Sequence, residues 1–273
     1  MIVRLYMRSD HPEINIVYSS KTIPTLRYPV LICGFPGSGY VGKLAVDHLI
    51  HELNATHLAD IYSTSFPAQL LIRADGTADL LKNYIFYSNV PTSYGTGLLL
   101  LSGDSQPSNP NSEYFLAEEI LDIASRFSTG QVLTLAAYIT GTFVTDPRIF
   151  GTAGDLDTIK TFNELNVHTM EGGSITGMNG IVVGIAKRRG MKGTCLLGET
   201  SGYVIDAKAS KAILETVVRI LNLKIDMTNI ERRAKDTEML IKTIEQQMTG
   251  TLKQQEEQQS IIPNRPSDMG YIS

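Results

Sequence analysis

The segment GFPGSGYVGKL, at residues 34–44, has the residue types and spacing of a phosphate-binding loop. Gly37, Gly39 and Gly42 fit G-x-G-x-x-G, the dinucleotide fingerprint, and the stretch that ends at Lys43 also fits G-x-x-x-x-G-K, the start of a P-loop. In such loops, backbone N–H groups at a helix N-terminus bind phosphate. A tight turn from a strand into a helix needs glycines for a different reason, because glycine permits positive φ and close packing. Either interpretation involves Gly34, Gly37, Gly39, Gly42 and Lys43.

Residues near this loop support the phosphate-binding interpretations unequally. Asp60 ends the next predicted strand, at about the 20-residue distance at which a dinucleotide-binding fold places its ribose-binding carboxylate. Pro36 removes one N–H donor beside the turn. Leu44 occupies the P-loop position of the Ser or Thr hydroxyl that binds magnesium. Because one G-x-G-x-x-G match is weak evidence, the structural role is favoured over nucleotide binding.

A second loop, SGDSQPSNP, follows a strongly apolar strand candidate. In α/β proteins, ligands bind beyond the carboxyl ends of strands, so Asp104 and Gln106 are candidate ligand-binding residues. Turn formation and helix capping use the same residue types. A further glycine-rich loop, EGGSITGMNG, is either a close-approach loop or a flexible one.

Other combinations of reactive residues lack the required spacing. His48, His51 and Glu52 do not form the H-E-x-x-H pattern of a zinc site. No segment combines a nucleophile, a base and oxyanion donors. We therefore expect no catalytic residue, no metal and no cofactor, with a nucleotide-binding enzyme as the alternative.

The elements that position these loops alternate between apolar strands and amphipathic helices. YPVLICGF predicts a strand before the glycine loop, and Val41, Ala45, Leu49 and Leu53 recur every fourth residue on one face of a helix after it. Further strands are predicted within residues 55–66, 76–90, 96–104, 131–140 and 192–200. Because β and α segments alternate, residues 1–225 are expected to form one α/β domain with a mostly parallel sheet covered on both faces.

Two helices of this domain carry capping signals. A helix over residues 111–127 is expected to begin at Asn111 or Ser112 and to bury Ile120, Leu121 and Ala124. A helix over residues 206–223 is expected to have Asp206 as its N-cap. The apolar run GIVVGIAKRRG fits a strand or a helix.

The composition becomes charged and Gln-rich after Leu223, which predicts a separate helix over residues 226–258. Its apolar stripe follows a heptad spacing and consists of Met227, Ile230, Ala234, Thr237, Ile241, Ile244, Met248 and Thr251. A helix lying on its own domain and a self-associating coiled coil explain this stripe equally well. Residues 259–273 contain two prolines and no periodicity, and are predicted to be a flexible tail.

The overall composition excludes several classes of protein. A net charge of −4 disfavours nucleic-acid binding, which needs a concentrated basic surface. Cys33 and Cys195 lie in or beside apolar runs and have no disulfide or metal spacing. No apolar run reaches the roughly 18 residues of a membrane span. We therefore expect a cytoplasmic protein without nucleic-acid or membrane partners.

Four sequence blocks in a fixed order carry a family resemblance. They are GFPGSGYVG, LLLLSGDSQP, GGSITGMNGIVVGIAKRRGMKG and LLGETSGYVIDAKASKAILETVVRILNLKID. On these blocks, which cover roughly residues 30–225, the chain resembles the archaeal and bacterial branch of the proteasome assembly chaperone 2 family. The last two blocks are the most specific.

This resemblance implies a three-layer α/β/α sandwich with a phosphorylase-like layout, in which the sheet is mostly parallel or mixed. It also implies homo-oligomers, with trimers and tetramers expected most, and binding to proteasome α subunits by some members. Such proteins look like enzymes without being known to be enzymes, although older labels relate the group to ATP-grasp enzymes. An ATP-grasp-like or dinucleotide-dependent enzyme that uses the loop from Gly37 to Lys43 is therefore the alternative.

The resemblance also bears on the end of the chain. Docking tails in the family typically end with a hydrophobic residue, a tyrosine and any residue. Here Tyr271 is third from last, and Ile272 occupies the tyrosine position before Ser273. These three residues are the candidate partner-docking tail, with an atypical pattern.

Overall fold

The four strands at the centre of the sheet are parallel and almost entirely buried. They lie in the order β8 (Thr96–Gly103), β3 (Val30–Cys33), β9 (Gln131–Ile139) and β12 (Lys192–Thr200). Strands covered by helices on both faces have continuous apolar sequences, which explains the runs VLIC and LLLL. The predicted parallel arrangement is therefore confirmed for this central part.

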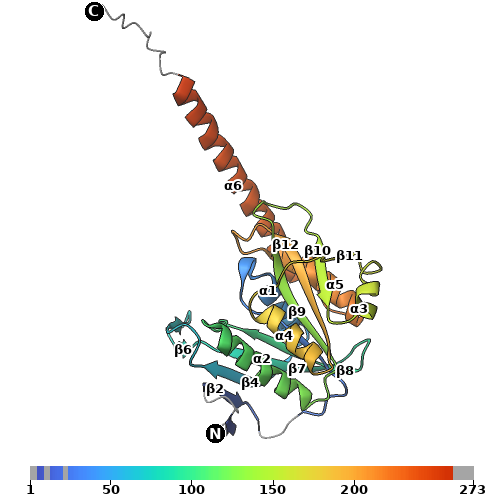
Figure 1. Ribbon diagram of the computed structural model, residues 1–273. Helices are drawn as coiled ribbons and strands as arrows, with labels where there is room; N and C mark the ends of the chain where they lie inside the picture. Colours follow the sequence, from blue (N-terminus) through green and yellow to red (C-terminus); the bar gives the residue numbers. More distant parts are fainter. Residues whose placement is uncertain (1–4, 9–12, 21–23, 261–273) are drawn as a thin grey trace, which may run out of the picture.

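Antiparallel strands extend this centre on both sides, so the complete sheet is mixed. The structure is a computed structural model that describes residues 5–8, 13–20 and 24–260 (Figure 1). Within these ranges the sheet has ten strands. Beyond β8 lie β7 (Asn83–Pro91), β4 (Thr56–Ser63), β2 (Ile14–Tyr18) and β1 (Leu5–Arg8). Beyond β12 lie β10 (Ile149–Ala153), which is antiparallel to it, and β11 (Val167–Thr169).

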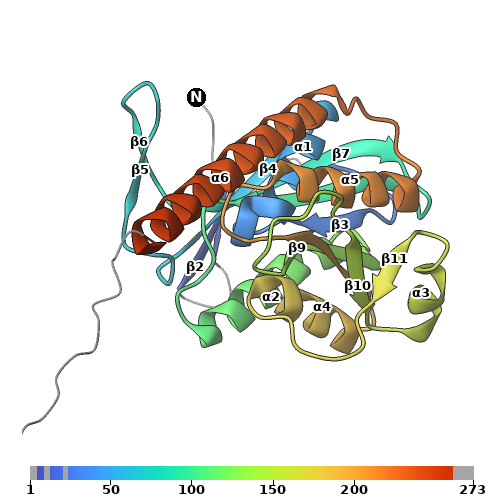
Figure 2. The same cartoon turned by 90° about the horizontal axis from the view of Figure 1, so that it is seen from above.

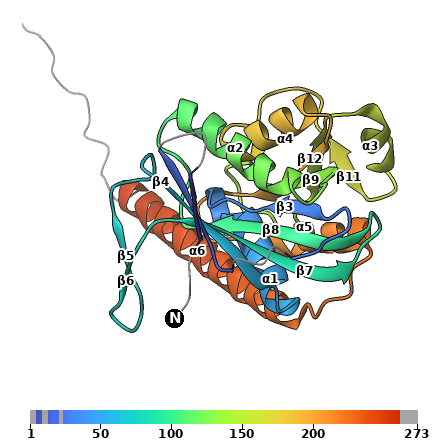
Figure 3. The same cartoon turned by 90° about the horizontal axis from the view of Figure 1, so that it is seen from below.

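Helices cover both faces of the sheet, which confirms the predicted α/β/α sandwich. One face carries α1 (Val41–Glu52) and α5 (Ala207–Leu221), and the other carries α2 (Pro110–Ser125) and α4 (Met178–Arg188) (Figures 2 and 3). The short α3 (Leu156–Thr161) lies beside β10 and β11. The apolar run GIVVGIAKRRG, which fits a strand or a helix by its sequence, forms most of α4. A separate hairpin of β5 (Leu70–Ile72) and β6 (Ala78–Leu80) stands apart from the main sheet (Figure 2).

The helix caps agree with the sequence in one case and differ in the other. Asp206 is the N-cap of α5, and its carboxylate accepts a hydrogen bond from the Ala209 N–H at 3.0 Å, as predicted. The predicted cap of α2 at Asn111 or Ser112 is wrong. Asn109 is the N-cap, and its side chain accepts from the Ser112 N–H at 2.9 Å. The helix begins earlier because Pro110, at the first helical position, has no N–H to lose and a φ already suited to a helix.

The long C-terminal helix α6 (Thr228–Ser260) has two parts with different surroundings. The stripe formed by Ile230, Ala234, Thr237 and Ile241 is buried in the domain, with α5 as the main neighbour. Beyond Ile241 the helix extends away from the sheet and its helices (Figure 1). The stripe therefore packs on its own domain as far as Ile241.

Two expectations remain, one about the C-terminal tail and one about membrane-spanning helices. Residues 261–273, which include Tyr271, Ile272 and Ser273, lie outside the described residues. A search of the described helices for a long, apolar, membrane-crossing segment finds none.

Candidate functional site

The glycine loop joins the end of β3 to α1 through a single 3₁₀ turn, η1 (Ser38–Tyr40). The Gly34 N–H donates to the Leu101 carbonyl at 2.8 Å, which extends the pairing of β3 with β8 by one bond. The Tyr40 N–H donates to the Gly37 carbonyl at 2.9 Å and closes the turn. The loop is thus a tight strand-to-helix connection, fixed by one backbone bond within it and one to β8.

The four glycines of this loop are needed to different degrees. A Cβ on Gly34 would lie 2.3 Å from the Gly42 carbonyl oxygen, and a Cβ on Gly42 would lie 1.9 Å from the Leu135 carbonyl oxygen. These two glycines therefore let α1 pack directly on β3 and β9. Gly39 has φ +62°, a conformation that side chains rarely adopt. A Cβ on Gly37 would have Gln106 Nε2, at 3.9 Å, as its nearest neighbour, so neither packing nor the turn requires that glycine.

Lys43 is held by side chains of α1 and of the sheet. Its ammonium lies 3.0 Å from the Asp47 carboxylate and donates to the Tyr84 hydroxyl at 2.9 Å and the Ser102 hydroxyl at 3.3 Å. Burial lowers the pKa of Lys43, but Asp47 and Tyr84 outweigh burial and raise it above its ordinary value. The lysine of a P-loop instead reaches the phosphates of its nucleotide. Its contacts give Lys43 a role in packing α1 against β7 and β8.

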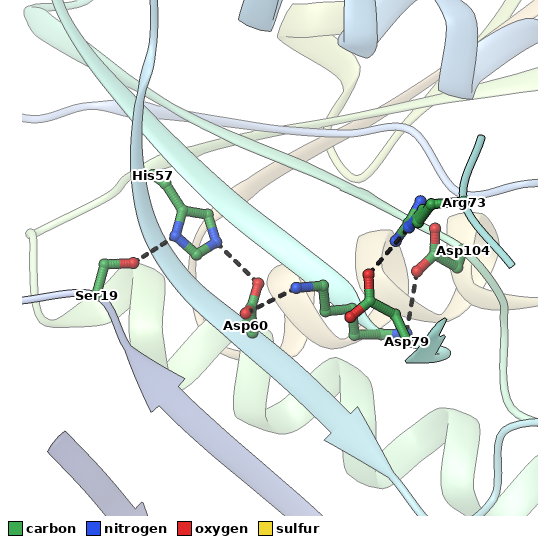
Figure 4. A network of polar contacts seen from close by, with 7 residues as sticks. Ser19, His57, Asp60, Arg73, Asp79 and Asp104 are labelled. Atoms are coloured by element: carbon green, nitrogen blue, oxygen red, sulfur yellow. Dashed lines mark hydrogen bonds and ion pairs between the residues drawn. The ribbon is translucent and has the colours of Figure 1, made fainter. Parts of the chain in front are cut away.

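Asp60 lies on β4, which β7 and β8 separate from β3. Its carboxylate accepts hydrogen bonds from His57 Nε2 at 2.8 Å and from Lys82 Nζ at 2.9 Å, and the other ring nitrogen of His57 contacts the Ser19 hydroxyl (Figure 4). In a dinucleotide-binding fold, the ribose-binding carboxylate ends the parallel strand next to the glycine loop. The strand order therefore does not bring Asp60 and the glycine loop together.

These contacts make Asp60 a source of stability that depends on pH. Burial raises the pKa of Asp60, but the hydrogen bonds from His57 and Lys82 outweigh burial and hold it below its ordinary value. Because its pKa is lower in the folded state, the Asp60 carboxyl contributes its full stability at pH values above its unfolded-state pKa of about 3.9. This contribution disappears as the pH falls through the folded-state pKa. We expect Asp60→Asn to lose about 2 kcal/mol at pH 7.

Urea denaturation of both proteins at pH 7 and at about pH 3 measures this contribution. The stability difference between wild type and Asp60→Asn should shrink at the lower pH. A difference that is equal at both pH values would contradict the assigned ionic role of Asp60.

A cleft of about 640 Å³ lies at the carboxyl ends of β3, β9 and β12. The glycine loop forms one wall, and the segment from Met170 to Asn179 forms another. Apolar and polar residues contribute to the lining. The main apolar residues are Phe35, Val41, Ala137, Tyr138, Ile139 and Ile175. The polar side chains are Ser38, Gln106, Glu113, Ser174, Thr176 and Asn179.

Gln106 and Asp104, predicted as one ligand-binding loop, lie in different surroundings. Gln106 lines the cleft, where its Nε2 donates to the Pro36 carbonyl at 2.7 Å and its Oε1 accepts from the Met178 N–H at 3.0 Å. Gln106 thus links the glycine loop to the start of α4. The Asp104 carboxylate accepts from the Lys82 N–H at 3.3 Å and lies near the hairpin pair Arg73 and Asp79 (Figure 4).

Several cleft residues gave little or no signal in the sequence. The EGGSITGMNG segment stands out in the sequence only for its glycines, and five of its residues line the cleft, at 174–177 and 179. Glu113, in the first turn of α2, and Tyr138, at the end of β9, carried no functional pattern. Each of these two residues lies in an ordinary helix or strand, and only the folded chain brings both of them to the cleft.

The described residues contain no group of three or more His, Cys, Asp or Glu side chains arranged to hold a metal ion. His48, considered above with His51 and Glu52, instead contacts the Asp226 carbonyl oxygen through Nε2 at 2.8 Å. This contact links α1 to the segment that leads into α6. Cys33 and Cys195 are both buried and free, and burial raises the pKa of the Cys195 thiol to about 12.

Comparison with known proteins places the chain among archaeal relatives. The family model described as PAC2 family matches residues 31–245. An uncharacterized protein of Methanocaldococcus jannaschii is 32% identical over 253 residues, which cover 92% of this chain and 95% of that protein.

Two solved structures are similar over most of the chain. Pyrococcus furiosus PbaB, an archaeal proteasome activator, matches with a TM-score of 0.78 and 37% identity, covering 85% of this chain and 99% of that one. Pyrococcus furiosus PbaA, an archaeal homolog of proteasome-assembly chaperone, matches with a TM-score of 0.69 and 25% identity, covering 92% of this chain and 100% of that one.

Proposed function

Because this chain belongs to the PAC2 family, we propose that it is a non-enzymatic, homo-oligomeric protein that binds proteasome α subunits. The similarity to PbaB and PbaA supports a proteasome partner. One feature of the chain carries the proposal: the C-terminal part of α6 extends away from the domain (Figure 1). A helix of this kind presents a docking segment to a partner without involving the sandwich.

The glycine loop in this proposal is part of the scaffold. Gly34 and Gly42 permit close packing, and Lys43 contacts Asp47, Tyr84 and Ser102. These contacts support a structural role over phosphate binding. We propose that the protein works without a nucleotide or metal cofactor.

The extending part of α6 can be removed without cutting into the core. A truncation at Asp226 would remove Ile230, Ala234, Thr237 and Ile241, which are buried, and would destabilise the domain itself. A truncation after Gln246 keeps all four. We expect the chain that ends at Gln246 to melt within about 2 °C of the full chain and to lose its binding to α subunits.

Native mass spectrometry of each chain, alone and mixed with the α subunits of its own organism, measures this prediction. The spectrum of the full chain alone also gives its subunit number, for which three or four is proposed. A full chain bearing Tyr271→Ala and Ile272→Ala is the matched variant, because it keeps α6 and changes only the candidate tail. If the chain that ends at Gln246 still bound α subunits, docking through α6 and the tail would be wrong. If neither chain bound, the proteasome partner itself would be wrong.

A further inference from the structure

The cleft beside the glycine loop has a distinctive charge. None of the residues described as lining it is Lys, Arg or His, and its one carboxyl group belongs to Glu113. Within the described chain, the Glu113 carboxylate forms no ion pair. Burial raises the pKa of this carboxyl, as expected for a group partly removed from water. A phosphate or carboxylate ligand would meet no cationic side chain in this lining and would be repelled by Glu113.

At the N-terminus of α4, which faces the same cleft, one backbone donor already has a partner. The N–H of Met178, its first residue, is already bonded to Gln106 Oε1. Gln106 is also bonded to the Pro36 carbonyl, so this side chain serves to join two walls of the cleft. Among the described residues that line the cleft, Glu113 is therefore the one charged side chain that a ligand would meet.

The rest of the cleft offers apolar surface and hydrogen-bonding groups in about equal parts. Ile139, Ile175 and Tyr138 provide apolar surface, and the Tyr138 ring is stacked on Phe150 with centroids 4.1 Å apart, which fixes its orientation. The Ser38 and Thr176 hydroxyls supply hydrogen-bonding groups. A volume of about 640 Å³ lies within the range of small-molecule sites.

We propose that this cleft binds a small organic ammonium compound, with its apolar body against Tyr138, Ile139 and Ile175 and its ammonium group donating to the Glu113 carboxylate. An ammonium group supplies the counter-charge that Glu113 lacks and donates hydrogen bonds that a carboxylate accepts. This site is independent of α6, so the inference does not rest on binding to the proteasome.

A series of three probes with one apolar body tests the charge preference. The probes are 2-phenylethylammonium, the neutral 2-phenylethanol and the anionic 3-phenylpropanoate. Isothermal titration calorimetry on the full chain at pH 7 should show that the ammonium binds about tenfold more tightly than the alcohol. The propanoate should bind more weakly than the alcohol. Equal affinities for the three probes, or no binding of the ammonium, would overturn the proposal.

Three variants locate the site. Glu113→Gln should remove the preference for the ammonium over the alcohol while keeping the apolar contacts. Gly37→Leu should weaken all three probes, because Gly37 lines the cleft and a Cβ there would have only Gln106 Nε2 nearby, at 3.9 Å. Glu171→Gln is the matched control. Glu171 is an exposed acid in the segment from Met170 to Asn179, but it does not line the cleft. A preference that survives in Glu113→Gln, or disappears in Glu171→Gln, would overturn the assignment.

A nucleotide probe separates this proposal from the phosphate-binding alternative. ATP, with and without magnesium, should not bind to the full chain in the same titration. If ATP bound and Gly37→Leu abolished that binding, the cleft would be an anion site and the ammonium proposal would be wrong.

Discussion

Replacing Gly42 with alanine should lower the free energy of unfolding by about 3 kcal/mol. The added Cβ would lie 1.9 Å from the Leu135 carbonyl oxygen, and this atom belongs to the buried strand β9. A flexible side chain would move aside, but here α1 and the sheet would have to separate. Their separation would loosen the contacts of Val41, Ala45 and Leu49, which are buried side chains of α1.

The other glycines of the loop provide an internal scale for this experiment. Gly39→Ala should cost about 1–2 kcal/mol, because it forces a left-handed backbone on alanine. Gly37→Ala should change stability by less than about 0.5 kcal/mol. Urea denaturation of the three variants gives the order directly. If Gly37→Ala were the most damaging of the three, the packing account of the loop would be wrong.

Replacing Asp206 with alanine should lower stability by a similar amount, about 3 kcal/mol. Asp206 is nearly fully buried and accepts hydrogen bonds from the Ala209 N–H at 3.0 Å and from the Thr200 hydroxyl at 2.6 Å. Its own N–H donates to the Gly39 carbonyl at 2.8 Å. Alanine would leave the buried Thr200 hydroxyl and the first turn of α5 without an acceptor, and buried groups without partners are costly.

Two matched variants separate the cap from its burial. Asp206→Asn keeps an acceptor oxygen for Ala209 and should retain most of the stability. Asp155→Ala removes the N-cap of the short peripheral helix α3, where Asp155 accepts from the Thr158 N–H at 2.9 Å, and should cost only about 1 kcal/mol. Thermal and urea unfolding of the three variants should give this order. An effect of Asp206→Ala no larger than that of Asp155→Ala would contradict the role of the Asp206 side chain in joining β12 to α5.

The central part of the fold follows from local patterns in the sequence. The runs VLIC and LLLL are apolar without interruption, as buried parallel strands are, and α1 shows its inward face through Val41, Ala45 and Leu49. The cap at Asp206 was also visible, because a single Asp precedes a long amphipathic run. Family membership, indicated by four blocks of sequence, is confirmed by the match over residues 31–245.

The peripheral strands and the cleft could not be predicted in the same way. Strands β10 and β11 have five and three residues, too few for a period to appear, and β2 pairs with a strand more than forty residues away. The position of Asp60 was misleading for a related reason. Its distance from the glycine loop along the chain suits a neighbouring parallel strand, but β4 pairs with β2 and β7 in antiparallel orientation. Spacing in a sequence does not determine the order of strands in a sheet.

If the chain docks through its C-terminal part as proposed, the extension of α6 beyond Ile241 would set how that part meets a partner. Residues 242–260 of the helix span about 28 Å at the usual rise of 1.5 Å per residue. A helical spacer fixes distance and direction, whereas a flexible linker of the same length would sample many positions and lose entropy on docking. In an oligomer, several such spacers would hold their ends at set separations. Each docked end would then raise the effective concentration of the next, so that weak individual contacts add up to strong avidity.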